Sequence, residues 1–192
     1  MSHQMPVLES ARLILRLGEP EDVPSIIRYF TENRPYLEPF EPQRPHNFLT
    51  KEFWMTELEA RKQAARRLRS QNYFIFPKTN PDEVIGAINL NNIVWGPFQA
   101  ATLGYSLAAA KQGNGYMTEA GQRLIRYGFE VLNLHRIMAN YMPQNQRSAN
   151  VLKRLGFVIE GEAKHYLFIN GKWQDHVLTS LVNPDWRCKN LS

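Results

Sequence analysis

Two glycines, one residue apart, precede a predicted helix in the stretch KQGNGYMTEA at residues 111–120. The first N–H groups of a helix have no partner inside it and carry a partial positive charge. Because Gly113 and Gly115 have no Cβ atom, an anion such as a phosphate can come close to these donors. The alternative is a helix-entry turn in which glycine only supplies an unusual φ angle. Thr118 stands where the dinucleotide-binding fingerprint needs its third glycine, so the turn alone does not decide between the two.

A second polar stretch, NQRSANVLKRLGF at residues 145–157, follows the next predicted strand. Ser148 opens a short helix predicted over residues 148–155, and Gly156 ends it. A hydroxyl in this position can cap the helix by accepting a backbone hydrogen bond. It can equally donate a hydrogen bond or a proton to a group bound nearby. One hydroxyl could do both, so both roles stay open.

The elements that must position these residues alternate between strand and helix, as in an α/β protein. Four prolines between residues 34 and 45 predict no regular structure there. No repeat or linker divides the chain, so residues 1–192 are expected to form one α/β domain. Asn170-Gly171 is a two-residue hairpin signal between strands at 166–169 and 173–181. The other predicted strands are 12–17, 73–76, 84–91, 102–107 and 136–141, and the predicted helices are 20–33, 50–69, 116–132 and 148–155.

Composition limits the class of protein. The 192-residue chain has a net charge of +5 and a pI near 9.4, which suits a phosphorylated ligand or an acidic partner and establishes neither. No apolar run approaches the roughly 20 residues of a membrane span, so no membrane contact is expected. The single cysteine, Cys188, cannot form an internal disulfide, which favours a cytoplasmic location. His135, His165 and His176 lack metal-ligand spacing, so no metal is expected.

Residues 112–120 and 145–157 together resemble the GNAT superfamily of acetyl-CoA-dependent N-acetyltransferases. The resemblance covers essentially the full chain. It implies the GNAT fold, an α/β arrangement with a mixed central β-sheet flanked by helices and a C-terminal β-hairpin. It also implies that two parallel strands of this sheet, here 102–107 and 136–141, splay apart. Acetyl-CoA is then the expected cosubstrate, and it would lie in the gap between them.

Other segments resemble the RimJ-type ribosomal-protein-alanine N-acetyltransferases more closely than the superfamily in general. Members of that family acetylate the N-terminal alanine of a small-subunit ribosomal protein, so the expected partner is the N-terminus of such a protein. The expected reaction is transfer of an acetyl group to its α-amine. The segments that carry this resemblance are Ser148 and residues 36–42, 135–143, 155–157, 175–179 and 184–186.

The resemblance places the cofactor around the glycine turn and the strand before it. One departure is Ala110, which stands where the superfamily pattern has Gln or Arg. Since backbone donors do most of the phosphate binding, this departure weakens only a side-chain contribution. The implied contacts to acetyl-CoA are Tyr105, Ser106, Leu107, Gln112, Gly113, Asn114, Gly115, Tyr116, Asn145 and Ser148.

The catalytic positions depart further from the family pattern. A related enzyme carries a glutamate base and a tyrosine acid at positions occupied here by Asn140 and Leu152. Neither residue can move a proton, so that pair does not carry over. We assign Ser148 and Asn140 to the catalytic centre, with Ser148 as donor to the departing sulfur. Backbone N–H groups around Tyr105 can stabilise the oxyanion. An N-terminal amine, with a pKa of about 7.7–8.0 against about 10.4 for lysine, has less need of a strong base.

Tyr36, Glu38, Glu41 and Tyr141 are the candidate substrate contacts. Glu38 and Glu41 lie on the proline-rich stretch, where they could receive the ammonium group of the substrate or relay its proton. The alternative for both is solvated surface charge.

The helix predicted at 50–69 offers a possible contact to the ribosome or to RNA, although such a basic run is normally a solvated face. Its basic residues are Arg61, Lys62, Arg66, Arg67 and Arg69. Two functions other than acetylation of a ribosomal-protein alanine stay open. One is acetylation of another protein N-terminus or of a small amine. The other is an RNA- or ribosome-binding module in which acetyl transfer is secondary.

Overall fold

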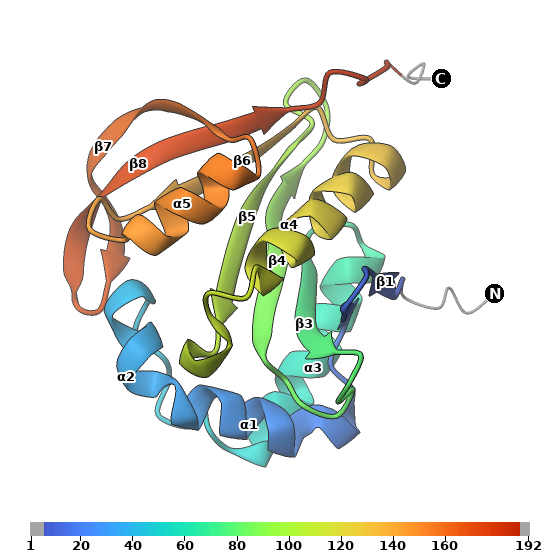
Figure 1. The fold of residues 1–192 in the computed structure, drawn as a ribbon, viewed down its shortest axis with the longest axis vertical. Coiled ribbons are helices and arrows are strands. Elements are labelled where there is room, and N and C mark those ends of the chain that lie inside the picture. The colour runs from blue at the N-terminus through green and yellow to red at the C-terminus, as the bar shows by residue number, and fades with distance from the viewer. Residues whose placement is uncertain (1–5, 189–192) are drawn as a thin grey trace.

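The computed structural model describes residues 6–188, and its centre is an eight-stranded mixed β-sheet (Figure 1). The strands lie in the order β1-β2-β3-β4-β5-β6-β8-β7. β5 and β6 are parallel, and every other pair of neighbouring described strands is antiparallel. The predicted mixed sheet with a central parallel pair is therefore confirmed. The strands are β1 (Leu8–Glu9), β2 (Leu13–Arg16), β3 (Gln71–Pro77), β4 (Gly86–Val94), β5 (Ala100–Leu107), β6 (Arg136–Tyr141), β7 (Val158–Ile169) and β8 (Lys172–Val182).

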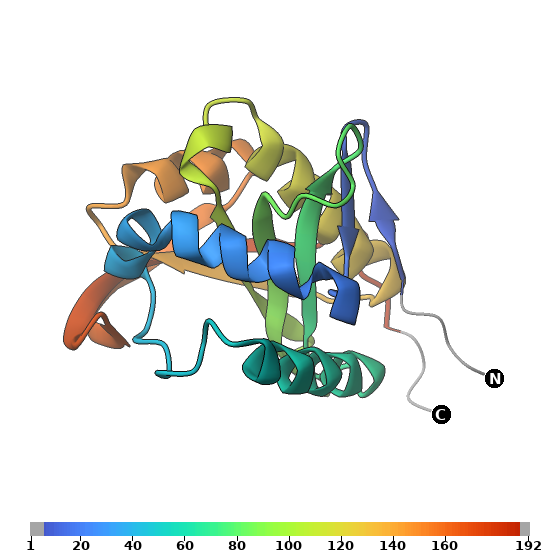
Figure 2. The same ribbon diagram turned by 90° about the horizontal axis from the view of Figure 1, so that it is seen from below.

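Helices cover both faces of the sheet. Figures 1 and 2 show α4 and α5 on one face and α3 on the other. A π-helical turn, Tyr127–Val131, continues α4. The helix predicted at 116–132 is therefore continuous, with an α-helical part followed by a π-helical part. The helices are α1 (Val23–Glu32), α2 (Arg34–Leu37), α3 (Lys51–Arg66), α4 (Tyr116–Arg126) and α5 (Gln146–Arg154), with short 3-10 turns at Pro20–Asp22, Glu38–Phe40 and Ala109–Lys111.

Two hydrophobic cores lie on the two faces of the sheet. β3 contributes to both, because Tyr73 and Ile75 pack beneath α4 while Phe74 and Phe76 pack against α1 and α3. A strand that is covered on both sides reads as a continuous apolar run, which explains the sequence YFIF. The same alternation along β5 and β6 decides which of their side chains point toward α5.

The prediction that residues 34–45 lack regular structure is wrong for the first half of the stretch. Arg34–Leu37 form the short helix α2, and Glu38–Phe40 form a 3-10 turn. Pro35 and Pro39 lie in the first turn of these elements, where a missing N–H group costs no intrahelical hydrogen bond. Residues 41–45 do lack regular structure, as predicted.

The C-terminal hairpin is confirmed, but its strands are longer than predicted. Asn170 and Gly171 both have positive φ angles, 44° and 76°, as the turn signal requires. β7 begins at Val158 and not near residue 166. Irregular register between Ile159 and Gly161, and again before Leu167, breaks the alternation of side chains that would have revealed the strand.

None of the helices within residues 6–188 has the length and apolarity that crossing a membrane requires.

Candidate active site

The two parallel strands at the centre of the sheet are paired over only three positions. Residues 100–102 of β5 pair with residues 136–138 of β6, and the two strands do not pair with each other beyond these positions. Beyond this point β5 keeps its partner β4 but has one unpaired edge at residues 103–107. Unpaired N–H and C=O groups on such an edge can bind an extended ligand. The predicted splay of the two strands is therefore present.

The glycine turn lies directly after the open end of β5 and starts α4. Gly113 and Gly115 have φ angles of +77° and +75°, so the backbone conformation alone already favours glycine. A Cβ atom at Gly113 would meet no described atom within 4 Å, which leaves space for a ligand in front of the turn. Gly115 is the N-cap of α4 and makes no side-chain hydrogen bond, so it leaves the first N–H groups of the helix available to a ligand. The two interpretations of the turn are thus compatible: the glycines supply the positive φ angles, and they also leave space for an anion.

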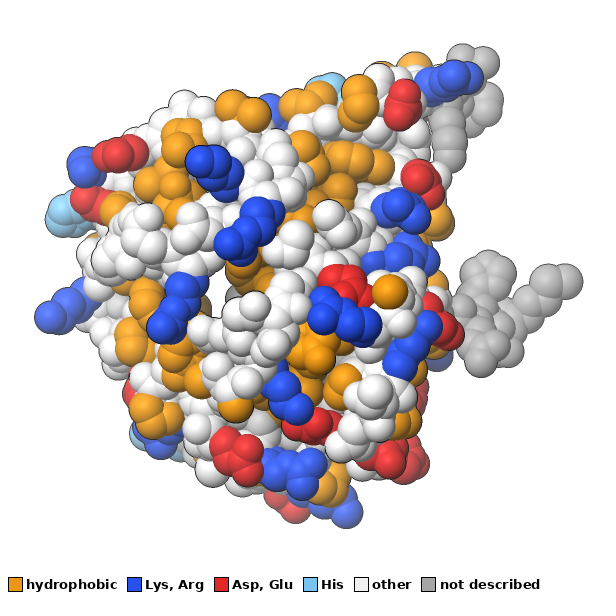
Figure 3. Space-filling view, in the orientation of Figure 1, with side chains coloured by type: hydrophobic (Ala, Val, Ile, Leu, Met, Phe, Trp, Pro, Cys, Tyr) orange, Lys and Arg blue, Asp and Glu red, His pale blue; other side chains and the backbone are white. Residues whose placement is uncertain are grey.

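The charge around this face suits an anion. Figure 3 shows a hollow near the middle of the face that carries α4 and α5, with Lys and Arg side chains around it. Asn114, one of the implied cofactor contacts, uses its amide within the turn, donating to the carbonyl oxygens of Lys111 (3.2 Å) and Gln112 (2.9 Å). The NH2 group of its side chain therefore shapes the turn, and its backbone carbonyl accepts a hydrogen bond from Arg12.

Arg12, which sequence reasoning missed, holds the glycine turn against β2. Its backbone N–H and Nε donate to the two carboxylate oxygens of Glu119, at 2.8 and 2.7 Å. Its Nη2 donates to the carbonyl oxygen of Asn114 at 3.0 Å, and its guanidinium lies 4.5 Å from the centre of the Tyr116 ring. The Ser10 hydroxyl also donates to Glu119. Glu119, which lies in the first turn of α4, thus has a mainly structural role.

Replacing Glu119 by glutamine should destabilise the protein near neutral pH and not in acid. Partial burial raises the pKa of Glu119, but hydrogen bonds from Arg12 and Ser10 outweigh it and leave the pKa below its ordinary value. A lowered folded-state pKa adds stability above the unfolded pKa of about 4.3, and this stability is lost as the pH falls through the folded value. We expect Glu119→Gln to cost about 1–2 kcal/mol near pH 7.

Thermal unfolding near neutral pH and at about pH 3 checks this expectation. Glu130→Gln is the matched control, because Glu130 is exposed and its nearest contact to Arg126 is 3.9 Å. An equal loss of stability at both pH values for Glu119→Gln would contradict the electrostatic explanation.

Ser148 is brought to the open edge of β5 and contacts Tyr105 there. The two hydroxyl oxygens are 2.7 Å apart. The cap of α5 is Asn145, whose side-chain oxygen accepts a hydrogen bond from the Ser148 N–H at 3.1 Å. The alternative in which Ser148 is a plain helix cap is therefore wrong, because Asn145 has that role. Cap boundaries are hard to read from sequence when two capping residue types stand three positions apart.

The opposite face of the gap carries a different set of side chains. Ser106 points away from Ser148, and its hydroxyl accepts a hydrogen bond from Tyr29 of α1 at 2.9 Å. Asn140 lies opposite Leu178 of β8 on this second face, and its amide makes no hydrogen bond to any described residue. Tyr141 packs with the α4 and α5 core. The two faces of the gap are thus chemically distinct, and the two β6 candidates lie on different ones.

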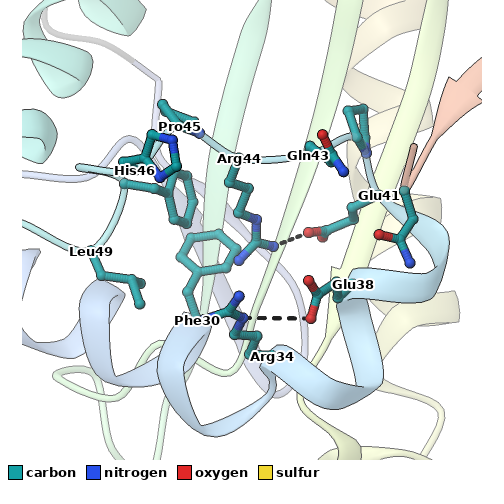
Figure 4. Close-up of a pocket in the computed structure, with 12 residues that line it drawn as sticks. Phe30, Arg34, Glu38, Glu41, Gln43, Arg44, Pro45, His46 and Leu49 are labelled. Carbon is teal, nitrogen blue, oxygen red and sulfur yellow. Dashed lines mark hydrogen bonds and ion pairs between the residues drawn. The ribbon is translucent and has the colours of Figure 1, made fainter.

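A pocket of about 440 Å³ lies between the stretch after α2 and the tip of the β7–β8 hairpin (Figure 4). Glu38 and Glu41 both line it, but each is paired: Glu38 with Arg34 at 3.5 Å, and Glu41 with Arg44. The alternative of solvated surface charge is wrong for Glu41, whose side chain is only 24% exposed. Neither carboxylate is an isolated acceptor for an ammonium group.

Arg44 organises this pocket. Its guanidinium lies 4.3 Å from the ring centre of Phe30 and 4.5 Å from that of Phe48, so it joins α1 to the loop that follows α2. The N–H of Asn170 donates to the carbonyl oxygen of Glu41 at 3.1 Å and joins the hairpin tip to the same loop. Sequence reasoning missed both contacts. Tyr36 lies outside this pocket, with the Arg147 guanidinium of α5 5.3 Å from its ring.

The basic run of α3 is partly used inside the protein. Arg61 pairs with Glu57 at 2.7 Å, and Lys62 pairs with Glu19 at 2.5 Å. Arg66, Arg67 and the nearby Arg69 are exposed. Within residues 6–188, no three His, Cys, Asp or Glu side chains are grouped closely enough to hold a metal ion.

Known proteins show the same architecture. Residues 12–158 match the family described as the acetyltransferase (GNAT) domain. The [ribosomal protein uS5]-alanine N-acetyltransferase of Escherichia coli is 44% identical over 185 residues, covering 93% of this chain and 92% of that protein. The ribosomal-protein-S5-alanine acetyltransferase of Vibrio fischeri superposes with a TM-score of 0.89 at 42% identity, covering 95% and 99% of the two chains. RimJ of Mycobacterium smegmatis, in complex with CoA-disulfide, has a TM-score of 0.87 at 27% identity, covering 93% and 88%.

Proposed function

The chain belongs to the GNAT acetyltransferase family, and from this membership we propose that it transfers the acetyl group of acetyl-CoA to the N-terminal alanine of a small-subunit ribosomal protein. The similarity to alanine N-acetyltransferases over more than nine-tenths of both chains supports this substrate. The observation that carries the chemistry is the open edge of β5, which lies between the glycine turn and the Ser148 hydroxyl.

The residues around the gap fit acetyl-CoA. The N–H groups that start α4 would hold its pyrophosphate, and the space in front of Gly113 leaves room for the approach. The unpaired edge of β5 would bind the extended arm that carries the thioester. Bound acetyl-CoA supplies an activated acetyl group with a thiolate as leaving group. The chain itself supplies donors at both ends of that arm.

Three tasks remain for the protein side chains and backbone. N–H groups on the open edge of β5 stabilise the oxyanion that develops on the acetyl carbonyl. Ser148 donates a proton or hydrogen bond to the departing sulfur. The amine reaches the thioester from the face of Ser106 and Asn140, opposite Ser148. Asn140 can orient this amine by hydrogen bonding, but it cannot remove a proton. Water is the acceptor, which suffices for an α-amine with a pKa of about 8.

The pocket between the α2 loop and the hairpin tip would take the residues that follow the N-terminal alanine. It lies on the side of α1, from which Tyr29 reaches Ser106. Because Glu38 and Glu41 are each paired with an arginine, the pocket has no large excess of negative charge. A small polyamine would find few unpaired carboxylates there, whereas a peptide can use the polar and aromatic lining. This arrangement favours a protein N-terminus as the substrate.

Acetylation of a peptide tests the proposed function. A peptide that begins with free alanine and also contains lysine should receive a single acetyl group on its α-amine, located by tandem mass spectrometry. The same peptide with a blocked N-terminus is the control and should stay unmodified. Incubation with purified small-subunit ribosomal proteins should modify one N-terminus, read by intact mass. Label found chiefly on lysine side chains would contradict the proposal.

A further inference from the structure

Within residues 6–188, the hydroxyl of Tyr105 makes two hydrogen bonds, and both are to Ser148. It lies 2.7 Å from the Ser148 Oγ and 3.2 Å from the carbonyl oxygen of the same residue. The two residues are 43 positions apart, on β5 and on the first turn of α5. Asn145 caps α5 in place of Ser148, so capping makes no demand on the serine hydroxyl. The main contact of that hydroxyl within the protein is therefore Tyr105.

When Tyr105 donates its proton to Ser148, two arrangements are possible. A carbonyl oxygen can only accept, and a tyrosine hydroxyl has a single proton to donate. If Tyr105 donates to the carbonyl, Ser148 must donate to Tyr105, and its proton then points away from any ligand. If Tyr105 donates to the Oγ at the shorter distance, the proton of Ser148 can point into the gap. Only the second arrangement leaves Ser148 able to act on a departing thiolate.

We infer that Tyr105 is a positioning residue, which donates its hydrogen bond to Ser148 and thereby directs the serine proton toward the leaving sulfur. This inference rests on the proposed function and on Ser148 as donor. As the C–S bond breaks, its electron pair goes to sulfur and the Ser148 O–H proton moves toward it. The negative charge that builds up on the Oγ strengthens the hydrogen bond from Tyr105. The proton released by the attacking amine returns to Ser148 through water.

The environment of Tyr105 keeps its hydroxyl in the donor form. Burial raises the pKa of Tyr105 to about 12 and outweighs the opposing effect of its hydrogen bond with Ser148. A raised pKa keeps the phenol protonated at every pH at which the enzyme would work. Packing of its ring against the α4 and α5 core keeps the hydroxyl directed at α5.

A double-mutant cycle tests the inference. Tyr105→Phe removes one oxygen atom and should lower kcat on the alanine peptide about tenfold, with KM for acetyl-CoA nearly unchanged. In a Ser148→Ala background the same change should have almost no further effect, because the group it positions is gone. Tyr73→Phe is the matched control, since Tyr73 is also a strand tyrosine whose hydroxyl donates to a neighbouring residue, Gln71, and the variant should keep the parent kcat.

Each outcome has a distinct meaning. If the parent chain acetylates the peptide and Tyr105→Phe does so at the same rate, the inference fails and the proposed function stands. Losses from the two substitutions that multiply in the double variant would also overturn it, because they would indicate independent effects. Slow hydrolysis of acetyl-CoA without peptide breaks the same C–S bond. The rate of this hydrolysis should also fall in Tyr105→Phe. Because no amine takes part in the hydrolysis, this measurement tests the inference even if the substrate is a different amine. Calorimetric titration with acetyl-CoA verifies that each variant is folded.

Discussion

Replacing Ser148 by alanine is expected to lower kcat by about 100-fold or more, the usual range for loss of general acid catalysis. The structure makes this expectation sharper than the sequence did. Since Asn145 caps α5, the substitution removes no helix cap, and stability should change little. Acetyl-CoA binding should be nearly preserved, because in the proposed site the glycine-turn donors, and not Ser148, hold the phosphates. Steady-state kinetics on the alanine peptide, together with calorimetric titration of acetyl-CoA, measures both quantities.

Ser180→Ala is the matched control for this experiment. Ser180 is buried, and its hydroxyl, like that of Ser148, forms a hydrogen bond to another side chain: it donates to Glu160 at 2.8 Å, near the closed end of the strand pair and away from the gap. Its kcat should equal that of the parent chain. A kcat for Ser148→Ala within about threefold of the parent would remove Ser148 from the chemistry, since general acid catalysis contributes far more than that.

Gly115→Val is expected to weaken acetyl-CoA binding by at least about tenfold, or about 1.4 kcal/mol. Two effects act together. Valine places a branched side chain where the pyrophosphate approaches the start of α4. It also strains the backbone, because φ at Gly115 is +75°, a region that β-branched residues avoid. A Cβ atom there would lie 3.6 Å from the Arg12 Nη2, which is ordinary contact, so a clash within the protein is not the cause.

Gly115→Asn separates the two effects, because asparagine tolerates the left-handed conformation while adding a side chain. If the phosphate needs close approach, Asn should also weaken binding. If Gly115 is needed only because it adopts a positive φ angle, the Gly115→Asn variant should bind acetyl-CoA with the affinity of the parent chain. Gly96→Asn is the matched control, since Gly96 has a φ of +70° with nothing near its Cβ position and lies in the β4–β5 loop. Unchanged affinity in both Gly115 variants would exclude the turn from the cofactor site.

Several features of this protein follow from the sequence by itself because they depend on neighbours along the chain. β6 has the predicted bounds, Arg136–Tyr141, since its alternation is regular. The Asn170-Gly171 turn and the two glycines before α4 adopt the positive φ angles that their residue types favour. The resemblance to one family extended this local information to the mixed sheet, its parallel pair and the position of the gap.

The tertiary structure alone decided which side chains meet. Arg12 and Glu119 are 107 residues apart, and no local pattern links them. Ser148 meets Tyr105 because the side chains of a strand alternate between faces, and the register of the sheet puts the odd-numbered residues of β5 toward α5. Arg44 is only three residues from Glu41, but its position beside that carboxylate depends on its packing against the rings of Phe30 and Phe48. Propensity and spacing describe the neighbours of a residue along the chain, whereas these contacts depend on how sheet and helices pack.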